Sequence, residues 1–124
     1  MKNLRIFGGL GEKYALYLLE KAGYKIIGKN FHAHQGEIDI IAIDPSTGSG
    51  PEATLVFVEV KTRWSDKYGK PEEAVGTVKL NRIRKTGEYY VLTHPNLPKK
   101  LRIDVVAIEV RGGKITSAKI IKAI

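Results

Sequence analysis

The segment that most constrains the fold is LVFVEVKTR, residues 55–63, where a valine-rich apolar run carries Glu59 and Lys61 near its end. β-branched and aromatic residues favour extended strands, and the side chains of a strand alternate between its two faces. We therefore expect Leu55, Phe57, Glu59 and Lys61 on one face and the three valines on the other. The segment predicts a core strand that presents two opposite charges side by side.

Helical and strand-like patterns alternate along the rest of the chain. Apolar residues at helical spacing indicate helices, whereas Ile- and Val-rich runs bounded by Gly, Pro and Ser indicate strands. The predicted elements are a helix over residues 11–22, strands over 24–31, 36–44 and 54–63, a helix from Pro71 roughly to Leu92, and strands over 101–110 and 114–124. The order αβββαββ predicts a mixed α+β (α/β) fold with a central mixed β-sheet flanked by helices.

Length and composition limit the classes of protein that this chain can represent. A chain of 124 residues, 43% of them hydrophobic, suits one compact domain over residues 1–124. Without cysteine, disulfides, thiolate metal sites and cysteine nucleophiles are excluded. No apolar run approaches the ~20 residues that span a bilayer, and the N-terminus lacks a signal-peptide core, so we expect a cytoplasmic protein with no membrane partner.

The charge balance favours a polyanionic partner. Twenty-one Lys and Arg against thirteen Asp and Glu give a net charge of +8. Between Lys61 and Arg102 there are eleven Lys and Arg against four Asp and Glu, so this stretch carries a net +7. DNA is the partner that we expect, and the alternative is a basic surface that only keeps the protein soluble.

Basic side chains recur on the second predicted helix. Lys79, Arg82 and Lys85 follow one another at three-residue steps, which places them close together on the helix surface. The candidate contacts to nucleic-acid phosphates are Arg63, Lys67, Lys70, Lys79, Arg82 and Lys85. Such contacts predict binding that weakens steeply with salt, whereas a merely solvated helix face would bind nothing.

Acidic residues on two neighbouring strands predict a metal site. Asp39 alternates with Ile41 and Ile43, so if this strand pairs with the next one Asp39 lies beside Glu59. Adjacent strands lie about 4.8 Å apart, close enough for two carboxylates to hold one Mg²⁺ or Mn²⁺ ion. Lys61 on the same face would help to activate a nucleophile and to stabilise charge on a phosphate. This combination indicates phosphodiester hydrolysis.

Two alternatives stay open for these charged residues. Glu59 and Lys61 also fit a salt bridge on an exposed edge strand, with Asp39 facing water. Glu12 lies on or beside the helical stripe of Ala15 and Leu19, which packs on the sheet. It is either a first-turn glutamate stabilised by the helix dipole or a further acidic group of the metal site.

Several segments together resemble a known family. GEKYALYLLEKAGYKIIGKNF, GEIDIIAID, VFVEVKTR, YGKPEEAV with Lys79, and RIDVVAIEV resemble the YraN-like family of small predicted endonucleases, which is similar to archaeal Holliday-junction resolvases. The resemblance covers nearly the whole chain and implies a restriction-endonuclease-like fold. It also implies an acidic site of the form Asp then Glu-x-Lys, often with a helix glutamate, which maps onto Asp39, Glu59, Lys61 and Glu12.

The expected function is that of a Mg²⁺- or Mn²⁺-dependent DNA endonuclease, with Asp39, Glu59 and Glu12 as metal ligands and Lys61 as a catalytic residue. A preference for branched DNA and a homodimeric state are implied by the resemblance alone. The alternative is a non-catalytic nucleic-acid-binding protein that keeps the nuclease fold.

His32 and His34 stand where the family often has arginines. Strand parity places them off the Asp39 face, which favours a polar surface or a pH-sensitive phosphate contact over a histidine metal site.

Overall fold

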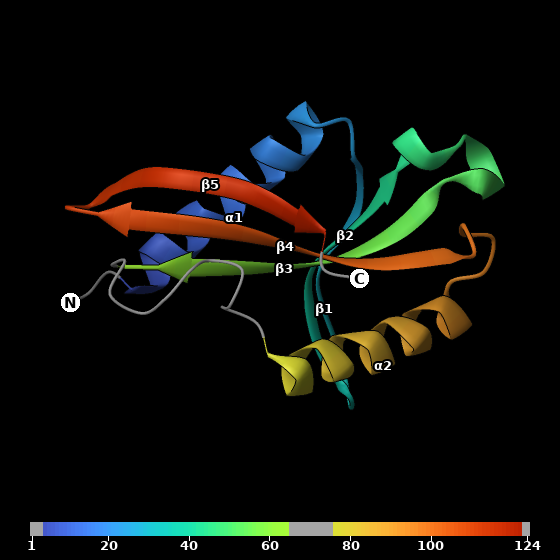
Figure 1. The fold of residues 1–124 in the computed structure, drawn as a ribbon. Helices are drawn as coiled ribbons and strands as arrows, with labels where there is room; N and C mark the ends of the chain where they lie inside the picture. The colour runs from blue at the N-terminus through green and yellow to red at the C-terminus, as the bar shows by residue number, and fades with distance from the viewer. Residues whose placement is uncertain (1–3, 65–75, 123–124) are drawn as a thin grey trace.

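The protein is described by a computed structural model that covers residues 4–64 and 76–122. This part of the chain contains two α-helices, two short 3-10 helices and five β-strands (Figure 1). In chain order these are α1 (Leu4–Lys21), β1 (Lys25–Ala33), β2 (Gly36–Asp44), η1 (Pro45–Thr47), η2 (Gly50–Glu52), β3 (Thr54–Arg63), α2 (Thr77–Thr93), β4 (Lys100–Arg111) and β5 (Lys114–Lys122). The mixed α+β class and the mixed sheet predicted from the sequence are confirmed.

All five strands form one sheet in the order β1-β2-β3-β4-β5. Strands β1 to β3 form an antiparallel meander, and β4 and β5 are also antiparallel, whereas β3 and β4 run parallel. Parallel neighbours need a crossover connection, and α2 lies in the connection between these two strands. None of the described helices is long and apolar enough to cross a membrane.

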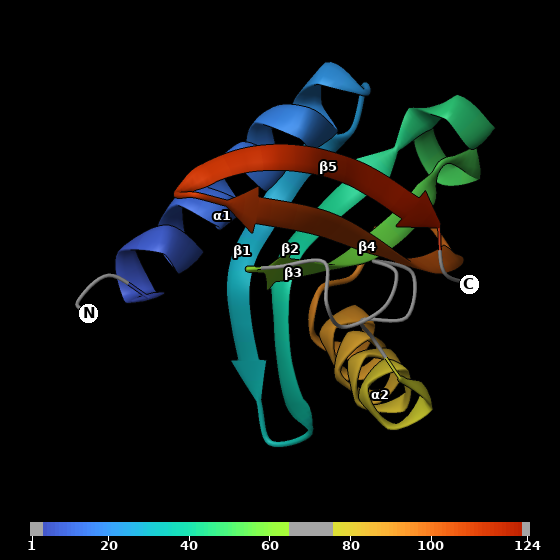
Figure 2. The same ribbon diagram turned by 60° about the vertical axis from the view of Figure 1, so that its left-hand side comes forward.

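The helices cover opposite faces of the sheet (Figures 1 and 2). Helix α1 buries Ala15 and Leu19 against a cluster that includes Val56 and Val58 of β3. Helix α2 buries Ile83 against Phe57 on the other face. The period-two alternation predicted for β3 is therefore confirmed, because its valines and its larger side chains enter different cores.

Several predicted boundaries differ from the structure. Helix α1 begins at Leu4 rather than residue 11, because the helix continues through Gly8 and Gly9 despite a propensity cost of about 1 kcal/mol for each glycine. Strand β1 begins at Lys25 rather than residue 24 and extends to Ala33 rather than residue 31, up to a short turn at residues 34–35, whereas β2 has the predicted bounds. The predicted helix start at Pro71 lies outside the described residues, as do the last two residues of the predicted final strand.

The full order of elements also differs from the predicted αβββαββ, because η1 and η2 lie in the segment expected to be an irregular turn. The carboxylate of Asp44 accepts a hydrogen bond from the Ser46 backbone N–H at 2.9 Å and so caps the N-terminus of η1. A short polar side chain that satisfies a backbone donor two residues on favours such a turn. The Pro- and Gly-rich segment thus contains two short 3-10 helices.

The ladder between β2 and β3 stops part-way along both strands. It runs from Asp44 opposite Thr54 to Ile40 opposite Val58. Beyond that point β2 continues beside β1 only, and β3 continues beside β4 only. Figure 2 shows β1 and β2 turning away from β3 and β4. We call this divergence the fork.

A buried ionic network closes the core on the α1 side. The Arg102 guanidinium donates to Asp104 Oδ1 and to Asp44 Oδ2, both at 2.7 Å. The Tyr24 hydroxyl donates to Asp104 Oδ2 at 2.6 Å. Asp104 and Asp44 are almost fully buried, and no buried side-chain N or O atom among the described residues lacks a partner. Arg102 and Asp104, alternate residues of β4, therefore form a structural ion pair.

Candidate active site at the fork

Asp39 lies at the point where β2 leaves β3. Its Oδ2 accepts a hydrogen bond of 2.8 Å from the Val60 backbone N–H, so the side chain bridges the fork where the ladder has ended. Strands β2 and β3 do pair, and the register that ends at Ile40 and Val58 would next place Asp39 opposite Glu59, but the ladder stops before that pair. The side chain of Asp39, rather than the ladder, brings the two acids into one site.

Glu59 lies on β3 with only 7% of its surface exposed. Its Oε2 is 3.2 Å from the Nζ of Lys79, which α2 supplies. Lys61 lies two residues after Glu59 on the same face of β3, and its positive charge lowers the pKa of the Glu59 carboxyl group. The Lys61 side chain itself is exposed. The two lysines thus approach one carboxylate from different elements.

Burial raises the pKa of both Asp39 and Glu59 above their ordinary values. The negative charge of Asp39 raises the pKa of Glu59 further, and the ammonium of Lys79 opposes this rise. Two neighbouring carboxylates that lose water disfavour their charged forms unless a cation lies between or beside them. The site therefore favours cations.

Glu12 approaches the same fork from α1. Burial raises the pKa of its carboxyl group, and the charge of Asp39 raises it further. A close contact between α1 and β3 positions it, since a Cβ atom added to Gly11 would lie 2.8 Å from Thr62 Oγ1. Glycine at residue 11 therefore lets the helix lie against the end of β3.

A cleft of about 410 Å³ opens onto Asp39 and Glu59. The residues that line it are Gly36, Glu37, Asp39, Glu59, Lys79, Arg82 and Ile83. Its walls combine carboxylates from β2 and β3 with cations from α2. Sequence reasoning did not select Gly36 or Glu37, although the parity that places Glu37 on the Asp39 face was the signal that could have found it.

The predicted phosphate contacts separate into groups. Lys79 and Arg82 line the cleft, whereas Lys85 is exposed on α2 and is not part of its lining. Arg63 is half-buried at the end of β3. Lys67 and Lys70 lie outside the described residues.

The two histidines lie on or beside the outer strand β1. His32 Nδ1 is 3.8 Å from Glu37 Oε2 across the β1–β2 hairpin, and both side chains are about two-thirds exposed, at 68% and 67%. A pair this exposed contributes little stability. His32 and Glu37 are opposite each other in the β1–β2 register, so His32 lies on the face of Glu37 and Asp39, and the prediction that it lies off that face is wrong.

The fit of the fork to a divalent cation depends on its donor set. Within the described residues, no three His, Cys, Asp or Glu side chains gather closely enough to hold a metal ion, so Glu12 does not complete a three-residue group with Asp39 and Glu59. Mg²⁺ is nevertheless commonly bound by one or two carboxylates together with water and substrate phosphates. Asp39 and Glu59, with their raised pKa values, are a donor pair of this kind.

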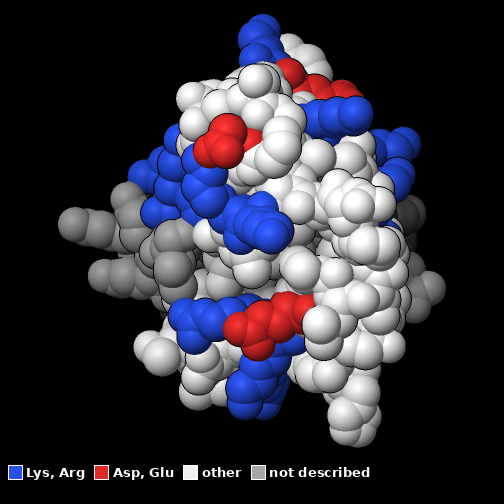
Figure 3. Space-filling model, turned by 90° about the vertical axis from the view of Figure 1, so that its right-hand side faces the viewer, with Lys and Arg blue, Asp and Glu red and all other residues white. Residues whose placement is uncertain are grey.

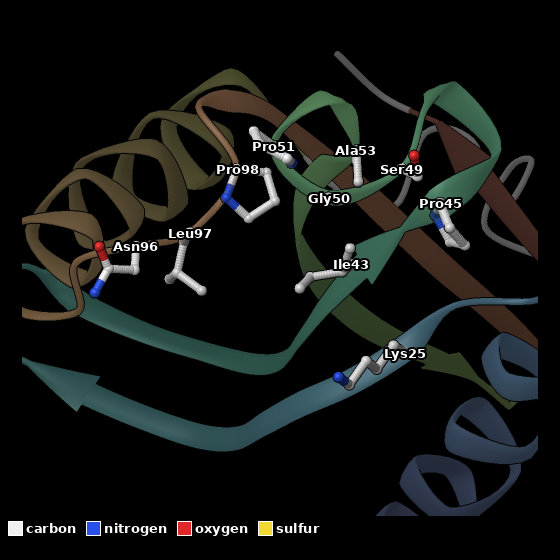
Figure 4. A pocket seen from close by; sticks show the side chains of 10 residues that line it. All are labelled: Lys25, Ile43, Pro45, Ser49, Gly50, Pro51, Ala53, Asn96, Leu97 and Pro98. Carbon is white, nitrogen blue, oxygen red and sulfur yellow. The ribbon is translucent and has the colours of Figure 1, made fainter.

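A second and larger hollow has a different chemistry. It measures about 640 Å³ and lies between η1, η2, β2 and the segment that follows α2 (Figure 4). Pro45, Pro51, Pro98 and Leu97 give it apolar walls, and Lys25 is the one ionisable side chain among the described residues of its lining. Without a carboxylate pair in that lining, it does not offer the acid and metal chemistry that the fork supports.

Positive charge is not confined to the cleft. On the face shown in Figure 3, Lys and Arg form several separate patches, and Asp and Glu lie beside some of them. This agrees with the net charge of +8 for the whole chain. Such positive patches attract a polyanion, and the carboxylate pair at the fork is the feature that sets the fork apart from them.

Comparison with known proteins places the chain in a family. The family model described as "Uncharacterised protein family UPF0102" matches residues 11–108, a span that includes Glu12, Asp39, Glu59 and Lys61. The chain belongs to the UPF0102 family. This confirms the YraN-like membership expected from the sequence motifs.

Individual UPF0102 proteins are similar over most of their length. A UPF0102 protein of Syntrophus aciditrophicus is 46% identical over 110 residues, which are 89% of this chain and 80% of the relative. Another, from Caldicellulosiruptor bescii, is 43% identical over 122 residues, 97% of each chain. A third, from Syntrophomonas wolfei, is 39% identical over 119 residues, 96% of this chain and 97% of the relative. These names specify no activity, so the function must be inferred from the fork.

Proposed function

We propose that this protein is a Mg²⁺- or Mn²⁺-dependent DNA endonuclease with a restriction-endonuclease-like fold. The observation that carries the proposal is the convergence of Asp39 and Glu59 at the fork, with burial raising the pKa of both carboxyl groups. Lys61 lies on the Glu59 face, and Lys79 and Arg82 line the same cleft. Carboxylates that favour a cation, beside lysines that attract phosphate, suit phosphodiester hydrolysis.

Each residue has a distinct part in this proposal. The Val60 N–H holds the Asp39 carboxylate in place, and β3 fixes Glu59. Together these two side chains would hold the metal ion, which when bound acts as a Lewis acid and makes water a better nucleophile. Lys61 would position that water and stabilise charge on the phosphate, while Lys79 and Arg82 would bind neighbouring phosphates.

Glu12 is proposed as an additional acidic group. The charge of Asp39 raises the pKa of the Glu12 carboxyl group, although Glu12 lies on α1. Among the described residues it does not complete a group of three metal ligands with Asp39 and Glu59, so it would orient water at the edge of the site.

Branched DNA is the proposed substrate class, and a second copy of the chain is the proposed partner. Two symmetric cuts in a junction need two sites related by a two-fold axis, which a homodimer supplies.

A second candidate function is non-catalytic binding of nucleic acid. The Lys79–Glu59 pair, with 3.2 Å between Nζ and Oε2, favours it, because an ammonium already supplies the positive charge that the carboxylates need. In that case the basic cleft would bind phosphates without cutting. Both candidates predict salt-sensitive binding of DNA, and only the nuclease predicts a dependence of strand cleavage on the acids.

The deciding experiment incubates the protein with a four-way junction, a flap, a linear duplex and single-stranded DNA, each in Mg²⁺, Mn²⁺ or EDTA. Asp39→Ala and Lys61→Ala should each reduce cleavage by about 10²-fold or more, since each removes a group that acts in the transition state. Glu52→Ala and Lys100→Ala are matched controls at exposed residues away from the fork and should cut like the parent. Absence of cutting in every metal, or equal cutting by all variants, would refute the nuclease.

A further inference from the structure

Large apolar and aromatic side chains are exposed on the flank of α1 that faces away from the fork. Leu10, Tyr14 and Tyr17 expose 48%, 36% and 53% of their surface. At about 100° per residue, all three lie on the side of the helix roughly opposite Glu12. They are therefore not needed for the core that α1 forms with the sheet.

These residues form one wall of a hollow of about 510 Å³. The opposite wall is the turn between β4 and β5, where Gly113, Lys114 and Ile115 contribute to the lining. Figures 1 and 2 both show this turn lying beside α1. The helix and the turn are far apart in the sequence, so the hollow forms only when the chain is folded. We call it the tyrosine hollow; its lining is Leu10, Lys13, Tyr14, Tyr17, Gly113, Lys114 and Ile115.

The two rings of the tyrosine hollow are held in place by their neighbours. The Tyr14 and Tyr17 ring centroids are 5.9 Å apart, with 46° between the ring planes. Lys21 Nζ lies 5.6 Å from the Tyr17 centroid and donates a hydrogen bond to its hydroxyl at 3.3 Å. A cation near a ring and a ring beside a ring are both favourable contacts. These contacts favour the ring positions that the structure shows.

The charges around the tyrosine hollow favour one class of ligand. Lys13 and Lys114 line it, Lys21 borders it, and no acidic residue is part of its lining among the described residues. A second copy of the chain docked here would place lysines against lysines across the two-fold axis, which is unfavourable. Aromatic rings beside lysines instead match a strand of unpaired bases, whose rings stack on tyrosine while the phosphates contact the ammonium groups.

We propose that the tyrosine hollow binds a single-stranded segment of DNA. The proposal rests on the nuclease function proposed above and narrows its substrate to DNA that carries an unpaired segment, such as a flap. Helix α1 links the two sites, because Glu12 approaches the fork while Tyr14 and Tyr17 lie on its other flank. An unpaired strand held on this flank would orient the adjoining duplex toward the cleft.

The test measures binding of a fluorescently labelled poly-dT strand of about 20 nucleotides, enough to cover a site of the usual size, to the full chain by anisotropy. EDTA is present so that no cleavage intervenes. Tyr14→Ala with Tyr17→Ala should weaken binding about 5- to 100-fold for each stacked base, the range found when a stacking side chain is removed. Tyr17→Phe keeps the ring and should bind like the parent. Tyr89→Ala is the matched control, because Tyr89 is 41% exposed on α2, on the other face of the sheet.

Three results would overturn the proposal. The double alanine variant could bind poly-dT like the parent, or Tyr17→Phe could lose as much binding as alanine. The double variant could instead convert a dimer into a monomer in sedimentation while keeping its affinity for poly-dT, which would make the tyrosine hollow an interface between copies. Binding in EDTA does not depend on cutting, so the two proposals can fail separately: a parent protein that cuts no DNA but needs the tyrosines for poly-dT supports the tyrosine hollow and refutes only the nuclease.

Discussion

Substitution of Gly87 by alanine tests how closely α2 must lie against the sheet. A Cβ atom at residue 87 would overlap Phe57 Cε2 and would lie 2.6 Å from Cδ2. Carbon atoms in van der Waals contact are about 3.5–4.0 Å apart, so the helix or the ring must move by about 1 Å. Phe57 is only 2% exposed, which leaves the ring no open space to enter.

The expected cost follows from two opposing effects. Overpacking of a filled core costs about 1–3 kcal/mol, and alanine gains back about 1 kcal/mol of helix propensity over glycine. We therefore expect Gly87→Ala to lower the free energy of unfolding by up to about 2 kcal/mol. Displacement of α2 would also lengthen the 3.2 Å contact between Lys79 and Glu59, since Phe57 is two residues before Glu59 on β3.

Urea unfolding of the parent, Gly87→Ala and Gly9→Ala measures this effect. Gly9 is the matched control, because it is also helical but no atom lies within 4 Å of the position that an added Cβ would occupy. Gly9→Ala should gain stability by up to about 1 kcal/mol. In a double-mutant cycle, Phe57→Leu should reduce the cost of Gly87→Ala. If Gly87→Ala and Gly9→Ala have the same free energy of unfolding, α2 does not lie as close to β3 as the structure shows.

Two further predictions concern charged residues. Burial raises the pKa of Asp44, but hydrogen bonds from Ser46 and Arg102 outweigh it and lower this pKa to about 2. Because the unfolded pKa is about 3.9, Asp44 stabilises the fold by about 2–3 kcal/mol above pH ~4, and this stability is lost as pH falls through about 2. Asp44→Asn should flatten the fall of the unfolding free energy between about pH 4 and pH 2, and an unchanged slope would contradict this account. Separately, Mg²⁺ should raise the thermal midpoint of the parent but not that of Glu59→Gln, and equal shifts would show that the ion binds elsewhere.

Period-two counting predicted the part of the fold that depends on single strands. It assigned Phe57 and Glu59 to one face of the segment at residues 54–63, and β3 has these bounds and these faces. It did not predict where the β2–β3 ladder ends, because the residues before Ile40 remain in strand β2 beside β1, and a strand pattern does not record that pairing on its other side has stopped. The end of a ladder depends on the twist of the whole sheet, which no local pattern records.

The candidate site, like the fold, could be predicted from the sequence only in part. Asp39, Glu59 and Lys61 follow from strand parity and from the resemblance to a family. The contact between Lys79 and Glu59 does not, since helical spacing indicated only that Lys79, Arg82 and Lys85 lie near one another. Which of these cations reaches the acids depends on how α2 is rotated against the sheet, and the packing of Ile83 and Gly87 on that face decides it.

The fork also explains how the protein tolerates a buried Glu59 beside a half-buried Asp39. If β2 and β3 continued as a regular ladder, the Val60 N–H would be used for strand pairing, and Asp39 would have no backbone donor. A carboxylate without a donor or cation is costly to bury. Divergence of the strands leaves the Val60 N–H for Asp39 and opens the cleft through which Lys79 reaches Glu59. The loss of ladder hydrogen bonds is therefore the structural condition for the acidic site, which is why the acids lie where the pairing ends.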